Sequence, residues 1–117
     1  FDVVLKRAEI NIESVTGDKH NPDDSWDYYV DHDAKIAYVR VASFMQQTSG
    51  QLKQVLDKLE KDGVKGIVLD LRYNPGGLLS SAIEVCDLFI KEGRIVSTKG
   101  RNTQDKSYNA SSDSILD

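Results

Sequence analysis

The feature that most constrains this chain is a glycine turn set directly between two apolar runs. Residues 66–71, GIVLDL, are apolar apart from one aspartate, which is typical of a strand covered on both faces by helices. Residues 78–91, LLSSAIEVCDLFIK, carry polar residues at every third or fourth position, and this spacing predicts a well-buried helix. The Pro-Gly-Gly turn at residues 75–77 therefore connects a strand to a helix.

The segments that precede this turn repeat the alternation of strand and helix. Residues 26–30 and 35–44 are rich in β-branched and aromatic side chains, and together they predict a β-hairpin. A helix is predicted from Thr48 to Gly63, because apolar residues recur there at intervals of three and four. Thr48 and Gln51 stand at the spacing of a capping box, which marks the start of this helix.

Together these elements predict an α/β fold. A further strand at residues 94–98 completes the order strand, helix, strand, helix, strand. Parallel neighbours need a long return path, so this order favours a mostly parallel sheet with two packed helices. Residues 26–99 would form this core. Residues 1–25 predict an N-terminal β segment that ends in a loop, and residues 100–117 predict a polar loop or a frayed terminus.

The composition excludes several classes of function. The net charge is −4 and the basic residues are scattered, so we expect no nucleic-acid partner. No run approaches the ~18 apolar residues of a membrane helix. The single cysteine, Cys86, lies among apolar neighbours, which predicts a small core residue. The acidic loop at residues 18–24 lacks the spacing of a calcium loop, so we expect neither a metal site nor a cofactor.

The glycine turn is the first candidate for a functional site. In open α/β sheets, ligands gather where strand carboxyl ends meet helix amino ends. Pro75 fixes one φ angle, while Gly76 and Gly77 can take positive φ and expose N–H groups at the positive end of the next helix. Such donors can hold a phosphate, or the oxyanion that forms when an acyl carbonyl is attacked. The glycine-rich phosphate motifs are absent, which favours the oxyanion; a purely structural turn is the alternative.

The polar residues next to the turn predict supporting roles. Asp70 and Arg72 alternate onto the same face of the strand, which predicts a local ion pair, and Asn74 can brace the loop through its side chain. Ser80 and Ser81 follow the turn directly, but their spacing predicts surface positions on the helix. Both histidines of the chain fall in predicted loops and no G-x-S-x-G motif is present, so a complete Ser-His-Asp site is not expected.

The motif D-L-R-x-N-P-G-G at residues 70–77 and the apolar helix after it lie within a longer continuous stretch, residues 48–101. This stretch closely resembles the carboxy-terminal processing peptidases, also called tail-specific proteases. The sequence IAYVRVASF at residues 36–44 is similar to the lead-in strand of that family. FDVVLKRAEINIESV at residues 1–15 resembles the segment that follows the family's PDZ domain, so the resemblance extends over nearly the whole chain.

The resemblance implies part of a serine endopeptidase that cleaves proteins near their C-termini, on a core similar to the ClpP and crotonase folds. In this family a lysine activates the serine nucleophile, and the glycine turn contributes a backbone donor to the oxyanion hole. That donor role falls here on Gly76 and Gly77. The residues that would support the turn are Asp70, Arg72, Asn74 and Pro75.

The resemblance also indicates what this chain lacks. The family's nucleophile lies in a G-S-x-S-A stretch beyond the strand predicted at residues 94–98, and its lysine lies farther on. Neither motif is present, so we expect no nucleophile in this chain and no activity from the chain in isolation. Apolar surface left without its neighbours would favour self-association of the chain.

The expected partners are the C-terminal tails of protein substrates. The resemblance implies that the longer protein from which this segment would come acts outside the cytoplasm, in a periplasmic, secreted or membrane-anchored form. Two alternatives use the same scaffold. One is a non-catalytic module that binds an extended peptide along an exposed strand edge. The other is a crotonase-like acyl-thioester enzyme, which also uses paired backbone amides as an oxyanion hole.

Overall fold

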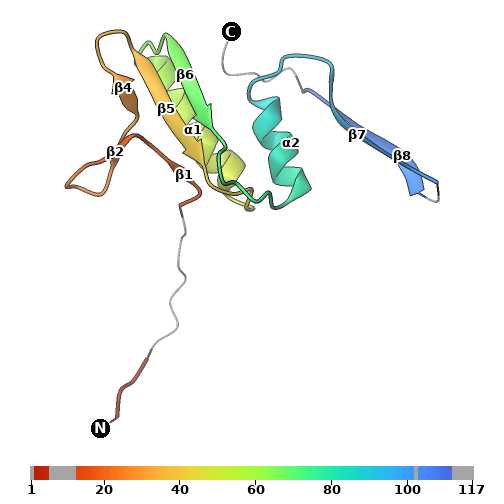
Figure 1. The fold of residues 1–117 in the computed structure, drawn as a ribbon, viewed down its shortest axis with the longest axis horizontal. Coiled ribbons are helices and arrows are strands. Elements are labelled where there is room, and N and C mark those ends of the chain that lie inside the picture. Colours follow the sequence, from red (N-terminus) through yellow and green to blue (C-terminus); the bar gives the residue numbers. More distant parts are fainter. Residues whose placement is uncertain (1, 6–12, 102, 112–117) are drawn as a thin grey trace.

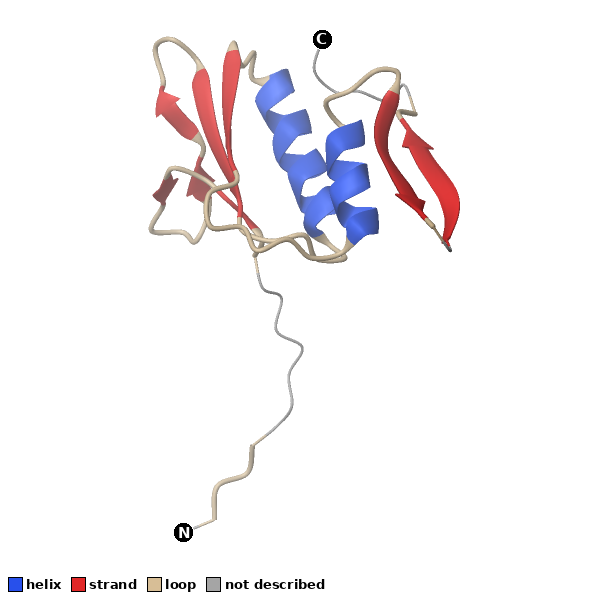
Figure 2. Cartoon of the chain, turned by 45° about the vertical axis from the view of Figure 1, so that its right-hand side comes forward, coloured by secondary structure: helices blue, strands red, loops and turns tan. Residues whose placement is uncertain are grey.

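The structure, a computed structural model, describes residues 2–5, 13–101 and 103–111 and has a mixed α/β fold (Figure 1, Figure 2). Its elements, in chain order, are β1 Val15–Thr16, β2 Lys19–His20, β3 Trp26–Asp27, β4 Tyr29–Asp31, β5 Ile36–Val41, α1 Thr48–Lys61, β6 Gly66–Asp70, α2 Leu79–Asp87, β7 Arg94–Gly100 and β8 Thr103–Asn109. The strands form one larger sheet and two separate hairpins, β2–β3 and β7–β8. Within the described ranges, neither helix has the length and apolar content needed to cross a bilayer.

Strand β5 lies at the centre of the larger sheet. β6 runs parallel along one edge of β5, with Ala37 opposite Ile67. β1 and β4 pair antiparallel with the two ends of the other edge, where Val15 lies opposite Val41 and Tyr29 lies opposite Ala37. The predicted hairpin is confirmed in part, as β4–β5, whereas Trp26–Asp27 at the start of its expected first strand pair with β2 instead.

The prediction of a mostly parallel sheet is wrong. Among the described strands, only β5 and β6 pair in parallel, and β7 joins β8 in an antiparallel hairpin instead of extending the sheet. β8 begins three residues after β7 ends, so closing this hairpin costs less loop entropy than pairing β7 with β6 across α2. The alternation of strands and helices predicts the order of the elements but not these pairings.

The two ends of the chain also differ from the prediction. Residues 100–117 were expected as a polar loop or a frayed terminus, whereas Thr103–Asn109 form strand β8. A hairpin strand held by backbone hydrogen bonds needs no buried apolar face, so its polar composition gives little signal. Residues 112–117 lie outside the described residues.

In the N-terminal part, the extended segment and loop predicted for residues 1–25 are only partly described. Residues 2–5 have no regular structure, and residues 6–12 lie outside the described residues. The structure places strand β1 after them, followed by the short β2–β3 hairpin, which begins where the sequence predicts that this N-terminal segment ends in a loop. The division of the chain at residue 25 stays a prediction.

The hydrophobic core lies between the larger sheet and the helices. Its buried residues are Val15, Ala37, Val39, Val41, Leu52, Leu56, Leu59 and Val85. Alternate β5 residues supply one side of this core, and Figure 2 shows α1 and α2 next to each other on the same side of the sheet. Strand β6 is therefore not covered on both faces as predicted, and Val68, on the opposite face, is 49% exposed.

The start of α1 also corrects an expectation. Thr48 is the first helical residue, the N-cap position belongs to Gln47, and no side chain caps this end. The Thr48 hydroxyl instead accepts the Met45 N–H at 2.8 Å, and it lies 2.6 Å from the hydroxyl of Ser14. Gln51 accepts a bond from that same Ser14 hydroxyl at 3.0 Å. The capping box does not form because Thr48 lies inside the helix instead of at its N-cap, and the side chains of Thr48 and Gln51 both form hydrogen bonds with Ser14, which lies just before β1.

Candidate functional site

The candidate site is the turn between β6 and α2. Directly after β6, the Asn74 N–H donates to the Leu71 carbonyl at 3.1 Å and closes a first tight turn. Tyr73 within that turn has a φ of 63°, which is rare for a residue with a side chain, and its ring is almost fully exposed. The exposed Pro75 follows, and the glycines then lead to Leu78, the N-cap residue of α2.

The Asn74 side chain ties this turn to the end of β5. Its Nδ2 donates to the Val41 carbonyl at 2.9 Å, and its Oδ1 accepts the Gly76 N–H at 2.7 Å. Val41 is the last residue of β5, so a single side chain holds the glycine turn at a fixed position relative to the central strand.

Gly77 makes a close backbone contact with Phe44, which follows β5. The two residues form a parallel β-bridge, in which the Phe44 N–H donates to the Gly76 carbonyl at 2.9 Å and the Leu78 N–H donates to the Phe44 carbonyl at 2.8 Å. A Cβ on Gly77 would lie 2.1 Å from the Phe44 oxygen, and the φ of Gly77 is 145°. Only glycine fits this position. A Cβ on Gly76 would meet no atom within 4 Å, although its φ of 101° also favours glycine.

The two glycine amides differ in their hydrogen bonding. The Gly76 N–H is engaged by Asn74, and the Leu78 N–H is engaged by Phe44. The Gly77 N–H between them has no hydrogen-bond partner among the described residues, and Gly77 is exposed. This amide lies two residues before α2 begins, where the helix dipole carries roughly half a positive charge. Of the two glycine amides, it is the one that remains available to a ligand.

A buried carboxylate fixes the strand end from which the turn departs. Asp70 is 7% exposed, and its Oδ1 accepts the Arg72 backbone N–H at 2.9 Å. The Arg72 guanidinium binds both carboxylate oxygens, with Nε to Oδ1 at 3.1 Å and Nη2 to Oδ2 at 3.0 Å. The Tyr38 hydroxyl donates to the same Oδ2. The Arg72 side chain and then the Tyr38 hydroxyl hold the pKa of Asp70 well below its usual range.

This lowered pKa predicts a pH dependence of folding. Because the carboxylate is favoured in the native state, its contribution to stability is complete above the unfolded pKa of about 4 and is lost as the pH falls towards the lower native pKa. We therefore expect Asp70→Asn to lower the free energy of unfolding at pH 7, and the difference from wild type to shrink below about pH 4. Denaturant unfolding at a series of pH values measures this difference, and one that stays constant with pH contradicts the prediction.

Sequence reasoning missed two residues of this site and misplaced a third. Tyr38 and Phe44 gave no signal beyond their places in a strand, because their contacts depend on the register between segments far apart in the sequence. Ser81 was expected on the surface with Ser80, but it is only 2% exposed and lies one turn before Val85 on the buried face of α2. Knowing which face of α2 the core covers would have corrected its position.

Within the described ranges, no group of three or more His, Cys, Asp or Glu side chains is arranged to hold a metal ion. What the turn offers instead is a backbone donor. A fixed, exposed N–H next to a helix amino end can hold a developing negative charge without rearranging.

Comparisons with known proteins show which proteins this chain resembles. Residues 35–115 match peptidase family S41. Over 97% of its length the chain is 35% identical to a probable CtpA-like serine protease of Staphylococcus aureus (strain N315), and it covers 20% of that protein. A probable CtpA-like serine protease of Staphylococcus saprophyticus is 33% identical over 96% of the chain, and the chain again covers 20% of that protein. Among solved structures, the photosystem II D1 C-terminal processing protease matches with a TM-score of 0.62 and 32% identity, over 68% of this chain and 21% of that one.

Proposed function

Because this chain belongs to peptidase family S41, as a segment of a C-terminal processing peptidase, we propose that it forms part of a catalytic domain that cleaves proteins near their C-termini. In this proposal the Gly77 N–H is a donor of the oxyanion hole. The serine nucleophile and its activating lysine come from outside the chain, which spans about a fifth of the length of the curated relatives that it matches. The longer protein that would carry them is called the parent protein below.

The observation that carries the proposal is the free Gly77 amide. A peptide carbonyl under attack develops a full negative charge on its oxygen, and a donor that is already aligned stabilises that charge without reorganisation. The Gly77 N–H is exposed, lies at the amino end of α2 and has no partner among the described residues. Gly76 has a different role here, because its amide is engaged by Asn74.

The surrounding contacts support a positioning function for the rest of the motif. Asn74 sets the turn against β5, and the Phe44 bridge holds both peptide groups that flank the Gly77 residue. Asp70 and Arg72 hold the end of β6 through their paired side chains. We assign no contact with substrate to these four residues. Their effect on catalysis would act through the orientation of one N–H.

The test compares the parent protein with the isolated chain. We expect the parent protein to hydrolyse an unstructured peptide with an apolar C-terminus, and the 117-residue chain not to do so, because an oxyanion donor cannot cleave a peptide bond without a nucleophile. Mass spectrometry of the products locates the cleaved bond. Hydrolysis by the purified chain would contradict the assignment of the nucleophile, and a parent protein that binds the peptide without cleaving it would contradict the proposed function.

A further inference from the structure

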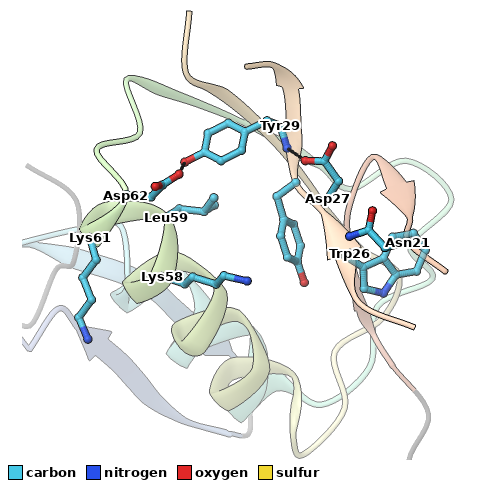
Figure 3. Close-up of a pocket in the computed structure, with 9 residues that line it drawn as sticks. Asn21, Trp26, Asp27, Tyr29, Lys58, Leu59, Lys61 and Asp62 are labelled. Carbon is cyan, nitrogen blue, oxygen red and sulfur yellow. Dashed lines mark hydrogen bonds between the residues drawn. The ribbon is translucent and has the colours of Figure 1, made fainter. Parts of the chain in front are cut away.

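A pocket lies far from the glycine turn. It has a volume of about 480 Å³ and opens between strands β3 and β4 and the C-terminal part of α1 (Figure 3). Its lining residues are Asn21, Trp26, Asp27, Tyr28, Tyr29, Lys58, Leu59, Lys61 and Asp62. Tyr29 pairs with Ala37 near the start of β5, whereas Asn74 of the glycine turn binds Val41 at its end. The pocket and the turn therefore lie at opposite ends of the central strand.

The acidic residues of this pocket are already engaged. The Asp62 carboxylate accepts the Tyr29 hydroxyl at 2.5 Å and lies 3.5 Å from the Lys35 ammonium. Asp27 accepts the Tyr29 N–H at 3.0 Å and lies 2.8 Å from the Nε2 of His32. Burial and the Asp62 carboxylate raise the pKa of Tyr29 to about 12, so this hydroxyl stays a neutral donor at physiological pH.

The lysines of the pocket are not engaged in this way. Neither Lys58 nor Lys61 forms an ion pair or a side-chain hydrogen bond with any residue that the structure describes. Figure 3 shows Lys58 extending from α1 into the space that faces Trp26, whereas Lys61 extends away from it. The pocket thus combines two hydrogen-bonded carboxylates with one ammonium group, that of Lys58, whose charge, after the Tyr29 hydroxyl, helps to lower the pKa of Asp62 but which forms no ion pair within the described ranges.

The remaining lining is apolar or aromatic. Trp26 and Tyr28 come from the strand side and the buried Leu59 comes from α1. A small inorganic anion would pair with the ammonium group but leave this surface without a partner. A peptide segment that carries both a carboxylate and apolar side chains would use both parts of the pocket, whose volume lies in the usual range for ligand sites.

We propose that this pocket binds an extended peptide segment in which an acidic side chain is flanked by apolar ones. The carboxylate pairs with the ammonium group of Lys58, and the apolar side chains pack on Trp26, Tyr28 and Leu59. The proposal does not depend on the peptidase function, because none of these residues belongs to the glycine turn.

The pocket contains its own reporter, since Trp26 is the one tryptophan of the chain. We expect the peptide acetyl-Leu-Glu-Leu-amide to change the tryptophan fluorescence in a saturable way. The matched peptide acetyl-Leu-Gln-Leu-amide should bind about three- to fivefold more weakly, because Lys58 is exposed and an exposed ion pair contributes little. Sodium glutamate, which offers the carboxylate without the apolar neighbours, should give no saturable change.

Two lysine variants assign the effect to its residue. Lys58→Gln should remove the preference for the glutamate peptide, whereas Lys53→Gln should keep it, because Lys53 lies on the same helix but pairs with Asp57 outside the pocket. Raising the salt concentration should narrow the difference between the two peptides. The proposal is overturned if neither peptide gives saturation, if both bind equally, if glutamate alone reproduces the signal, or if the two lysine variants behave alike.

Discussion

Replacing the Gly77 N–H with an ester oxygen in the parent protein is expected to lower kcat about 100- to 1,000-fold, with little change in KM. The replacement removes one hydrogen-bond donor and leaves every side chain in place. Under the proposed function this donor acts mainly on the charge that forms in the transition state, so its loss slows the chemical step more than it weakens substrate binding. Semisynthesis of the parent protein with glycolic acid at position 77, followed by steady-state kinetics, gives both constants.

The structure supplies an internal control for this experiment. The Gly77 N–H has no partner among the described residues, so the ester at position 77 affects the fold only through the Gly76 carbonyl, which becomes a weaker acceptor for the Phe44 N–H, and we expect it to lower the free energy of unfolding by less than about 1 kcal/mol. The same replacement at Gly76 removes a bond to Asn74 and should destabilise the fold by about 1 kcal/mol. An ester at position 77 that retains full kcat would limit the turn to a structural role.

Gly77→Ala is expected to destabilise the chain by about 3–5 kcal/mol, which is a large part of the stability of a small domain. The added Cβ would lie 2.1 Å from the Phe44 carbonyl oxygen, and the backbone at Gly77 has a φ of 145°. The turn can accept the methyl group only by moving away from Phe44 and breaking the bridge between them. Denaturant unfolding of the chain measures the loss.

Gly76→Ala is the matched control for this substitution. Its φ of 101° makes a side chain unfavourable, but a Cβ there would meet no atom within 4 Å. We therefore expect a loss of only about 1–2 kcal/mol, from backbone strain alone. Equal losses of unfolding free energy for the two variants would contradict the close contact with Phe44. In the parent protein, the Gly77 variant should also lose far more activity than the Gly76 variant.

Local patterns predicted the parts of this molecule that depend on neighbouring residues. The apolar run of β6, the spacing of apolar residues in α1 and the position of the Pro-Gly-Gly turn were all evident from the sequence. The turn was recognised as a candidate from its position between a strand and a helix, and from the N–H groups that its two glycines can expose.

What the sequence could not provide depends on contacts between distant segments. The distinction between Gly76 and Gly77 arises from Asn74 and Phe44, and Phe44 is placed by the end of β5. The third partner of Asp70 is Tyr38, which reaches it only through the register of β5 with β6. The pairing of β7 with β8 was missed for the opposite reason, because a polar hairpin strand has no periodic apolar signal.

The outer edge of β6 is open, since no described strand pairs with it. A segment added there would be positioned in steps of about 3.3 Å per residue, and a slip of one residue would reverse which of its side chains point towards the helices. β6 ends at Asp70 and continues directly into the glycine turn. The register of an added segment along this edge would therefore determine which of its atoms lie next to the turn.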